Sequence, residues 1–415
     1  MHPKKSSHTI LLFAILLAIL VCTGSAMAQT ERVLYSFQGG SDGINPTTSL
    51  IADSAGNLFG TTTDGGSGNC DGGCGVVFEL KPAHGGGWTE SIIHTFQGGT
   101  DGAFPYAGLI FDQAGNLYGT TLSGGGKSHD GTVFELTPSG KTWTETVLHS
   151  FTGKDGSYPI AGLVFDPAGN LYGTTLFGGP TQGGTVFQLS LSGGVWKETV
   201  LHSFNGRYDG IDPAASMIFD PNTGQNGVLY GTTMGGNVFK LTPPAAGKTR
   251  WTLKSIYTDH GGQDGGEISP GTLLADKNGA LYATRQYGGP ANAGAVFQLT
   301  PPAKKNGAWT ATTIYRFGGG SDGLYPFGGV IADAAGNLYG TTAGDDQTSH
   351  GTVFQLTPPA QQGGSWTKTT LYAFTGGSDG SAPNAGLIFG KGGVLYSTSA
   401  GGGASSKGTV FEIVP

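Results

Sequence analysis

The side chains with the greatest capacity for chemistry lie in residues 257–287, where a pattern repeated along the whole chain is interrupted. Asp259 and Glu267 supply two carboxylates, which is the set that hydrolysis of a glycosidic bond requires. The other candidates offer groups that bind polar ligands: His260, Arg285 and Tyr287, with Arg207 and Tyr208 from the preceding loop. We predict that these seven side chains line a polar recess. The alternative is a degenerate repeat without a function of its own.

Three histidines share one position of the repeat: His94, His149 and His202. The same position holds tyrosine in the other copies: Tyr35, Tyr257, Tyr315 and Tyr372. A position that accepts either aromatic ring is typical of packing within a strand. We therefore predict that these histidines are structural and do not act as catalytic bases.

An Asp-Gly pair recurs in the segment that leads from each copy to the next, at Asp42, Asp101, Asp155, Asp209, Asp264, Asp322 and Asp379. Calcium takes six to eight oxygen ligands, whereas each segment usually offers one carboxylate and no EF-hand loop is present. We predict that the aspartates cap turns, with calcium binding as the alternative. No other metal and no cofactor is expected.

Two cysteines, Cys70 and Cys74, lie in a glycine-rich loop. Structural zinc needs four ligands, and the neighbourhood of this loop does not supply the others. In an oxidising compartment the two thiols are expected to form a local disulfide.

The repeat that positions these residues has a period between 53 residues (Phe151 to Phe204) and 59 residues (Phe37 to Phe96). One clean copy contains four strand-like segments separated by Gly, Asn and Pro: Ala107–Asp112, Leu117–Thr121, Thr132–Thr137 and Trp143–Phe151. A small four-stranded sheet cannot cover both of its faces alone, so neighbouring copies must stack on it. The sequence therefore predicts an all-β fold, a seven-bladed β-propeller of four-stranded antiparallel blades.

The predicted blades form a single domain of residues 29–415 and span about 47–96, 106–151, 160–204, 214–259, 271–317, 327–374, and 384–415 plus 30–37. The last copy stops at Pro415 after its third strand, whereas residues 32–37 match the fourth strand of the other copies. We therefore predict that the N-terminal strand completes the last blade and closes the ring.

Residues 1–28 have the features of a secretory signal: Lys4 and Lys5, an apolar run, and the small-residue site Ala26-Met27-Ala28. Cleavage before Gln29 would give a secreted or periplasmic protein without stable membrane insertion. It would also remove two lysines and no acid, which changes the formal net charge from −7 to −9. Because no basic cluster is present, nucleic acid is not an expected partner.

The recurring Gly-Asn-Leu-Tyr-Gly-Thr-Thr, Gly-Thr-Val-Phe and Gly-Gly-x-Asp-Gly phrases resemble the GloVer (Gloeo/Verruco) tandem repeats of secreted bacterial proteins, over essentially the whole mature chain. The resemblance implies export and says little about chemistry. Family members carry varied C-terminal anchors, whereas this sequence ends at Pro415 without one, which leaves surface attachment open. The order of strands, Gly-Gly and Trp-Thr is also similar to that of kelch propellers, which supports the architecture only.

These observations favour an exported binding or interaction module that recognises glycans or cell-envelope components on a Gly-rich loop face. Aromatic residues expected at loop tips, such as Phe104, Tyr158 and Phe177, could stack on sugar rings. Two alternatives stay open: a polysaccharide hydrolase or lyase with Asp259 and Glu267 as its paired acids, and a purely structural exoprotein. Motifs of serine hydrolases, zinc proteases and nucleotide-binding enzymes do not occur.

Overall fold

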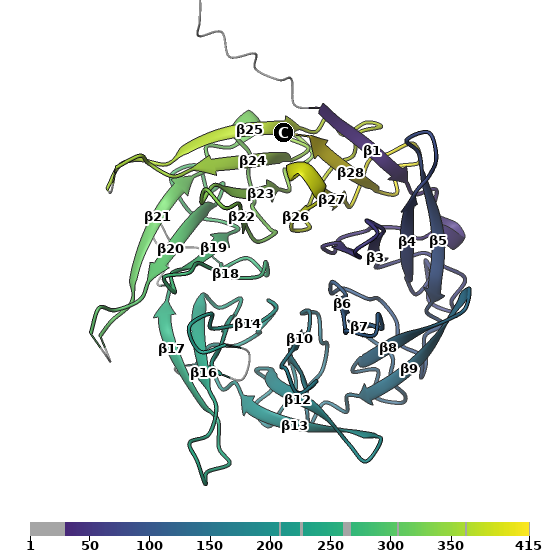
Figure 1. Cartoon of the computed structure of the whole chain (residues 1–415), viewed down its shortest axis with the longest axis vertical. Helices are drawn as coiled ribbons and strands as arrows, with labels where there is room; N and C mark the ends of the chain where they lie inside the picture. Colours follow the sequence, from purple (N-terminus) through teal and green to yellow (C-terminus); the bar gives the residue numbers. More distant parts are fainter. Residues whose placement is uncertain are drawn as a thin grey trace, which may run out of the picture.

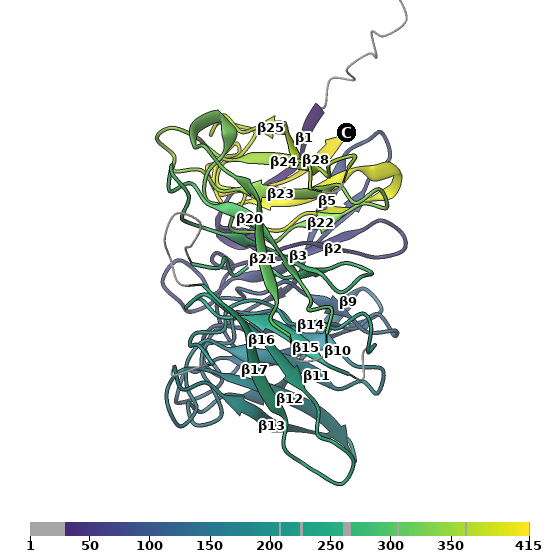
Figure 2. The same ribbon diagram turned by 90° about the vertical axis from the view of Figure 1, so that its left-hand side faces the viewer.

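A computed structural model describes residues 30–206, 209–224, 227–259, 267–304, 307–361 and 363–414. These residues form seven four-stranded antiparallel sheets, which are arranged as blades around a common centre (Figures 1 and 2). The predicted all-β, seven-bladed propeller is confirmed. Within the described ranges, none of the helices is long and apolar enough to cross a membrane. The predicted signal segment lies outside the described residues.

The blades follow one another along the chain, and each runs from a short inner strand to a long outer strand. Blade 1 contains β2 (Ile51–Ala52), β3 (Leu58–Thr62), β4 (Val76–Pro82) and β5 (Trp88–Thr95). Blade 2 contains β6 (Ile110–Phe111), β7 (Leu117–Thr121), β8 (Thr132–Ser139) and β9 (Thr142–Ser150). Blade 3 contains β10 (Val164–Phe165), β11 (Leu171–Thr175), β12 (Thr185–Ser192) and β13 (Val195–Ser203). Blade 4 contains β14 (Ile218–Phe219), β15 (Leu229–Thr232), β16 (Asn237–Thr242) and β17 (Thr252–Thr258).

The remaining blades repeat this order. Blade 5 contains β18 (Leu274–Ala275), β19 (Leu281–Arg285), β20 (Ala295–Thr300) and β21 (Thr310–Arg316). Blade 6 contains β22 (Ile331–Ala332), β23 (Leu338–Thr342), β24 (Thr352–Thr357) and β25 (Thr367–Ala373). Blade 7 contains β26 (Ile388–Phe389), β27 (Leu395–Ser399), β28 (Thr409–Val414) and β1 (Thr30–Ser36). Three single-turn 3-10 helices lie in connecting segments: η1 (Gly40–Asp42), η2 (Gly320–Asp322) and η3 (Lys391–Gly393).

The second strand of most blades carries Gly-Thr-Thr, and blade 2 shows why the glycine is needed. All five residues of β7 are buried, and a Cβ on Gly119 would lie only 2.6 Å from the ring of Phe134 on β8. Any larger residue would therefore displace that ring. The turn before β7 is built by Asp112, whose Oδ1 accepts hydrogen bonds from the backbone N–H groups of Ala114 and Asn116 at 2.8 and 2.9 Å.

Neighbouring blades are joined by phenylalanine pairs. The Phe that follows the outer strand of one blade meets the Phe on the third strand of the next, as in Phe96 with Phe134, whose ring centroids are 5.2 Å apart. The same edge-to-face contact occurs at six of the seven blade interfaces: 37 with 78, 96 with 134, 151 with 187, 204 with 239, 317 with 354, and 374 with 411. These pairs confirm that the repeated Val-Phe motif packs between blades.

The ring closes between its first and last strands. β1 pairs with β28 in antiparallel register from Thr30 opposite Val414 to Ser36 opposite Thr409, and the two strands lie side by side in Figure 1. Arg32 adds an ion pair of 2.7 Å to Glu412. Closure by the N-terminal strand is therefore confirmed.

Candidate functional site

One face of the ring is built by the segments that connect successive blades and by the glycine-rich loops between second and third strands; we call it the loop face. In blade 2 these segments are residues 97–109 and 122–131. They are held together by main-chain hydrogen bonds, such as Ala103 N to Ser123 O and Leu122 N to Phe104 O, at 2.8 and 2.9 Å. The loop face is therefore positioned by backbone bonds that depend little on side-chain identity.

In six of the seven connecting segments, the residue before the proline has a left-handed backbone conformation. Phe104, Tyr158 and Tyr325 adopt left-handed backbone conformations, with φ of 59°, 56° and 60°, immediately before a proline. Such a conformation costs on the order of 1–3 kcal/mol for a bulky residue. The Phe104 N–H is anchored to the carbonyl oxygen of Cys74 at 2.8 Å, which helps to hold it. The residue after each proline lies at the central cavity.

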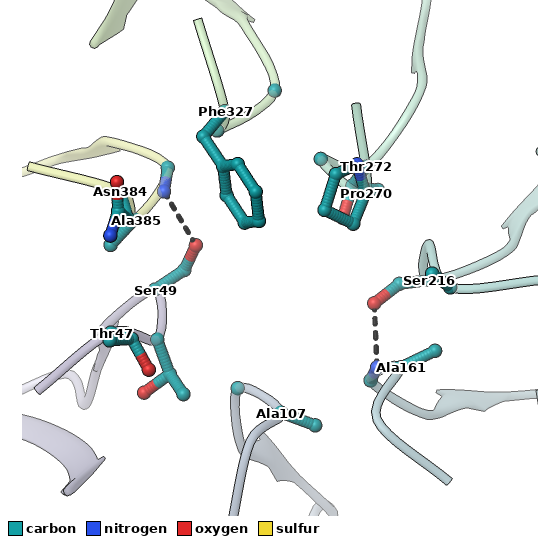
Figure 3. A pocket seen from close by; sticks show the side chains of 18 of the residues that line it. Thr47, Ser49, Ala107, Ala161, Ser216, Pro270, Thr272, Phe327, Asn384 and Ala385 are labelled. Atoms are coloured by element: carbon teal, nitrogen blue, oxygen red, sulfur yellow. Dashed lines mark hydrogen bonds between the residues drawn. The ribbon is translucent and has the colours of Figure 1, made fainter. Parts of the chain in front are cut away.

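The central cavity has a volume of about 520 Å³ and is lined by all seven blades. Most of its lining comes from the residues between the proline and the inner strand. Figure 3 shows hydroxyl and amide side chains on its walls, namely Thr47, Ser49, Ser216, Thr272 and Asn384. Its size lies within the range of small-molecule sites in proteins.

Two serines stabilise the wall of the cavity. Ser216 Oγ accepts a hydrogen bond from the Gly162 N–H at 2.8 Å, and Ser49 Oγ accepts one from the Gly386 N–H at 3.1 Å (Figure 3). Each bond crosses a blade interface, so it fixes the position of the wall as well as the serine. The hydroxyl oxygens keep further hydrogen-bonding capacity toward the cavity.

Two aromatic rings also line the cavity. Phe327 projects into it in Figure 3, and Tyr106, which is 47 % exposed, belongs to its lining. Among the described residues of the lining, none carries a charged side chain, an imidazole or a thiol. Such a lining favours an uncharged ligand with apolar faces and hydroxyl groups.

Two of the seven predicted site residues meet in a different place, between blades 4 and 5. Arg285 Nε and Asp259 Oδ2 form an ion pair of 2.6 Å, with side-chain exposures of only 3 % and 5 %. Arg285 also donates to the Tyr257 hydroxyl at 2.7 Å, and its guanidinium lies 4.0 Å from the centre of the Phe297 ring. Asp259 occupies the position of the usual Phe, so this ion pair replaces the phenylalanine pair of the other six interfaces.

The remaining predicted residues do not join that pair. Glu267 is exposed, and Tyr287 packs against Tyr325 with ring centroids 5.3 Å apart. Arg207, Tyr208 and His260 lie outside the described residues. That these side chains contact a ligand stays a prediction.

The Asp-Gly aspartates cap turns, as predicted. In all six described copies the carboxylate accepts a hydrogen bond from a backbone N–H three or four residues earlier, as in Gln38 N to Asp42 Oδ2 at 2.7 Å. The aromatic side chain at the shared His/Tyr position also contacts this carboxylate, as in Tyr35 Oη to Asp42 at 3.0 Å. Asp264 lies outside the described residues.

At some blade interfaces, a glutamate from the next blade lies near the turn-capping aspartate and its His or Tyr partner. At the interface of blades 7 and 1, Glu90 Oε1 and Asp42 Oδ1 are both buried, and neither has a hydrogen-bond partner among the described residues. Burial, followed by the nearby Asp42 charge, raises the pKa of Glu90 to about 7. Burial and the charge of Asp379 raise the pKa of Glu31 to about 7 in the same way, at the interface of blades 6 and 7.

Glu90→Gln should stabilise the protein at pH 8 and leave its stability almost unchanged at pH 4. The folded protein keeps the Glu90 proton up to about pH 7, whereas the unfolded chain releases it near 4.5, so ionisation lowers stability as pH rises through that interval. Because Glu90 keeps contact with water, we expect a gain of about 1 kcal/mol and not the larger value of a fully buried group. Urea unfolding at both pH values measures it, with exposed Glu267→Gln as the control. An equal effect at pH 4 and pH 8 would contradict the assignment.

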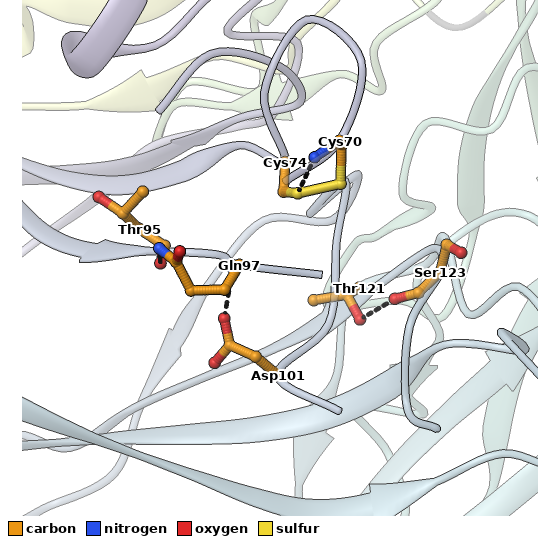
Figure 4. Close-up of a disulfide and its surroundings, with 7 residues drawn as sticks. All are labelled: Cys70, Cys74, Thr95, Gln97, Asp101, Thr121 and Ser123. Carbon is orange, nitrogen blue, oxygen red and sulfur yellow. Dashed lines mark hydrogen bonds between the residues drawn. A yellow bond between two sulfur atoms is a disulfide. The ribbon is translucent and has the colours of Figure 1, made fainter. Parts of the chain in front are cut away.

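The two cysteines form a disulfide, as shown in Figure 4. It closes the glycine-rich loop between β3 and β4, next to the turn in which Asp101 Oδ2 accepts a hydrogen bond from Gln97 N at 2.6 Å. The Cys70 N–H also donates to Cys74 Sγ at 3.1 Å. The bridge therefore holds one glycine loop of the loop face in shape.

Solved structures with a similar fold include several enzymes and a surface protein. A fungal alcohol oxidase of the AA5 family, in complex with copper, matches with a TM-score of 0.55 and 12 % identity, over 93 % of this chain and 76 % of the oxidase. A luciferin-regenerating enzyme matches at 0.46 and 13 %, over 81 % and 98 %. PorZ, a surface component of the type-IX secretion system of Porphyromonas gingivalis, matches at 0.44 and 14 %, over 84 % and 48 %. At 12 % identity the likeness to the oxidase shows the fold alone.

The sequence comparisons give a more specific result. The comparison with curated proteins finds no match. A family model described as the Gloeobacter/Verrucomicrobia repeat matches four overlapping regions, residues 22–164, 67–262, 126–333 and 234–415, which together cover nearly the whole sequence. The chain therefore belongs to the Gloeobacter/Verrucomicrobia repeat family, as its recurring phrases predicted.

Proposed function

We propose that this protein is an exported binding module that recognises an uncharged carbohydrate, such as a glycan of a cell envelope, in the central cavity of its loop face. The observation that carries the proposal is the composition of that cavity. Hydroxyl and amide groups on its walls can exchange hydrogen bonds with sugar hydroxyls. The rings of Tyr106 and Phe327 offer apolar surfaces for the C–H faces of a sugar.

The absence of charge in the described lining gives the proposed site its selectivity. An anionic sugar that entered the cavity would lose its bound water and find no positively charged group among the described lining residues. Burying a charge without such a partner is costly. A neutral glycan loses less on entry and gains hydrogen bonds from Thr272 and Asn384. We therefore expect neutral glycans to bind more tightly than uronic acids or sialylated glycans.

The alternative functions have less support. For a hydrolase with Asp259 and Glu267 as paired acids, Asp259 would have to react while it holds Arg285 in a buried ion pair. A purely structural exoprotein would not need a cavity of this size on the loop face. Binding at the cavity accounts for more of the described geometry than either of these.

A glycan array with residues 29–415, run together with an assay for released reducing sugar on every hit, tests the proposal. We expect binding to neutral glycans with dissociation constants in the micromolar to millimolar range and no release of sugar. Release of reducing ends would favour the hydrolase. Binding restricted to anionic glycans, or no binding to any glycan, would contradict the proposed function.

A further inference from the structure

Three side chains that commonly bind metal ions converge at the interface of blades 2 and 3. His149 lies on β9, Asp155 in the following segment, and Glu198 on β13. One ligand atom from each lies within 4.8 Å of the other two, and His149 Nε2 is 3.1 Å from Asp155 Oδ2. In a tetrahedral zinc site with bonds of about 2.0–2.1 Å, neighbouring ligand atoms lie a little more than 3 Å apart. The present arrangement is therefore close to one that could hold a cation.

Glu198 supplies an independent indication that something is needed at this place. Its Oε1 atom is shielded from solvent and has no hydrogen-bond partner among the described residues. A buried carboxylate oxygen is costly unless a donor or a cation faces it. His149 and Asp155 are 20 % and 21 % exposed, so an ion could enter from solution without unfolding the interface.

Another blade shows that a positive charge can be accommodated next to the turn-capping aspartate. In blade 6 the residue equivalent to Glu198 is Lys368, two positions after the repeated tryptophan. Its ammonium contacts Asp322 Oδ1 at 3.1 Å and the Asp322 carbonyl oxygen at 2.6 Å, and its side chain is only 4 % exposed. The fold thus places a cation against the turn-capping aspartate where the sequence provides one.

We propose that His149, Asp155 and Glu198 bind a divalent transition-metal ion such as Zn²⁺, with water completing the coordination. The nitrogen and oxygen donors are those that zinc accepts in proteins. Because His149 belongs to blade 2 and Glu198 to blade 3, a bound ion would cross-link two blades. The site is separate from the central cavity, so it does not depend on the proposed function.

The neighbouring interfaces provide two natural comparisons. Between blades 1 and 2 the same residue types recur as His94, Asp101 and Glu145, with His94 Nε2 at 3.3 Å from Asp101 Oδ1. Among the described residues, however, only His149, Asp155 and Glu198 bring three such ligand atoms within 4.8 Å of one another. Between blades 3 and 4 the His202–Asp209 contact is kept at 2.9 Å, but Leu253 takes the place of the glutamate. That interface should bind no ion.

Calorimetric titration of EDTA-treated residues 29–415 with Zn²⁺ tests the site, and the visible spectrum of added Co²⁺ reports its geometry. We expect low-micromolar binding that Glu198→Gln weakens by at least about 10–100-fold, because losing a ligand should cost no less than losing an outer-shell partner of one. Glu145→Gln changes the wider group between blades 1 and 2 and should bind like the wild type. His202→Gln is the matched control and should bind like the wild type, and far-ultraviolet circular dichroism checks that each variant is folded.

The results distinguish a metal site from a cluster in which Glu198 only holds a proton. Loss of Zn²⁺ binding in Glu198→Gln but not in His202→Gln would support the proposal. Wild-type affinity in Glu198→Gln, an equal loss in His202→Gln, or a wild-type dissociation constant above about 1 mM would overturn it. Stabilisation of Glu198→Gln without any Zn²⁺ binding by the wild type would also overturn it, because the glutamate would then be holding only a proton.

Discussion

Replacing Arg285 with alanine should lower the free energy of unfolding by about 3–5 kcal/mol, because it breaks a buried ion pair from one side only. The Asp259 carboxylate, whose side chain is 5 % exposed, would stay in the interface without its guanidinium partner. The variant would also remove the cation that covers the Phe297 ring at 4.0 Å. Urea unfolding monitored by circular dichroism measures the loss.

A matched variant restores the pattern of the other interfaces. Asp259→Phe combined with Arg285→Thr recreates the phenylalanine pair and the small side chain found between blades 1 and 2. Replacing a buried ion pair by well-packed apolar groups is often neutral or stabilising by about 1–4 kcal/mol, so this variant should be at least as stable as the wild type. A loss as large as that of Arg285→Ala would contradict the packing account. If the folded variant also lost glycan binding, the predicted polar recess would gain direct support.

Deleting residues 30–37 should destabilise the ring even more strongly. The deletion removes β1 from its pairing with β28 and removes Phe37, which is fully buried and lies 5.2 Å from the Phe78 ring. Truncation of one such buried phenylalanine to alanine costs about 3–5 kcal/mol, and the deletion also exposes the edge of β28. We expect aggregation or loss of a cooperative unfolding transition.

Hydrogen exchange of the segment 409–414 checks this result at the level of single strands. In the closed ring β28 is bonded to β27 on one side and to β1 on the other. Its amides should therefore exchange as slowly as those of β8, which is an interior strand of blade 2. The single variant Phe37→Ala, which keeps the strand, serves as the milder control. Equal protection of residues 409–414 with and without β1 would mean that closure contributes little.

The fold could be predicted from the sequence because each copy carries its own strands, turns and packing residues. Gly119 and Phe134 illustrate this, since their contact lies within one blade and recurs in most of the others. The missing fourth strand of the last copy, matched by residues 32–37, was enough to predict the closure. These features are local or strictly periodic, which is why the sequence shows them.

The central cavity could not be predicted in the same way, because each blade contributes only a few residues to it. Thr47, Tyr106, Phe327 and Asn384 are widely separated in sequence and meet only when the ring closes. A signal was nevertheless present: the residue after the proline of each connecting segment varies widely between copies, although proline always precedes it and Ala, Thr or Gly always follows it. Variation at one position of an otherwise regular repeat indicates a surface that is free to specialise.

The sequence shows that Asp259 and Arg285 break the repeat pattern, but it does not show that both side chains are buried. Asp259 follows the last strand of blade 4 and Arg285 ends a strand of blade 5. That the two charges neutralise each other in a buried ion pair is visible only once the two blades are placed side by side. The Glu198 cluster was missed for the same reason, since its three residues belong to two neighbouring blades. Interactions across an interface appear in a single sequence only when both partners repeat.

The most direct test of the account is a titration of the tightest glycan hit into the wild type and into Tyr106→Ala/Phe327→Ala. Because those rings belong to the cavity, we predict that the double variant binds at least about tenfold more weakly. Tyr158→Ala/Phe177→Ala removes two other aromatic residues of the loop face, each 38 % exposed and outside the cavity, and should bind within about twofold of the wild type. Unchanged binding by the cavity variant, together with lost binding by the loop variant, would contradict the central claim.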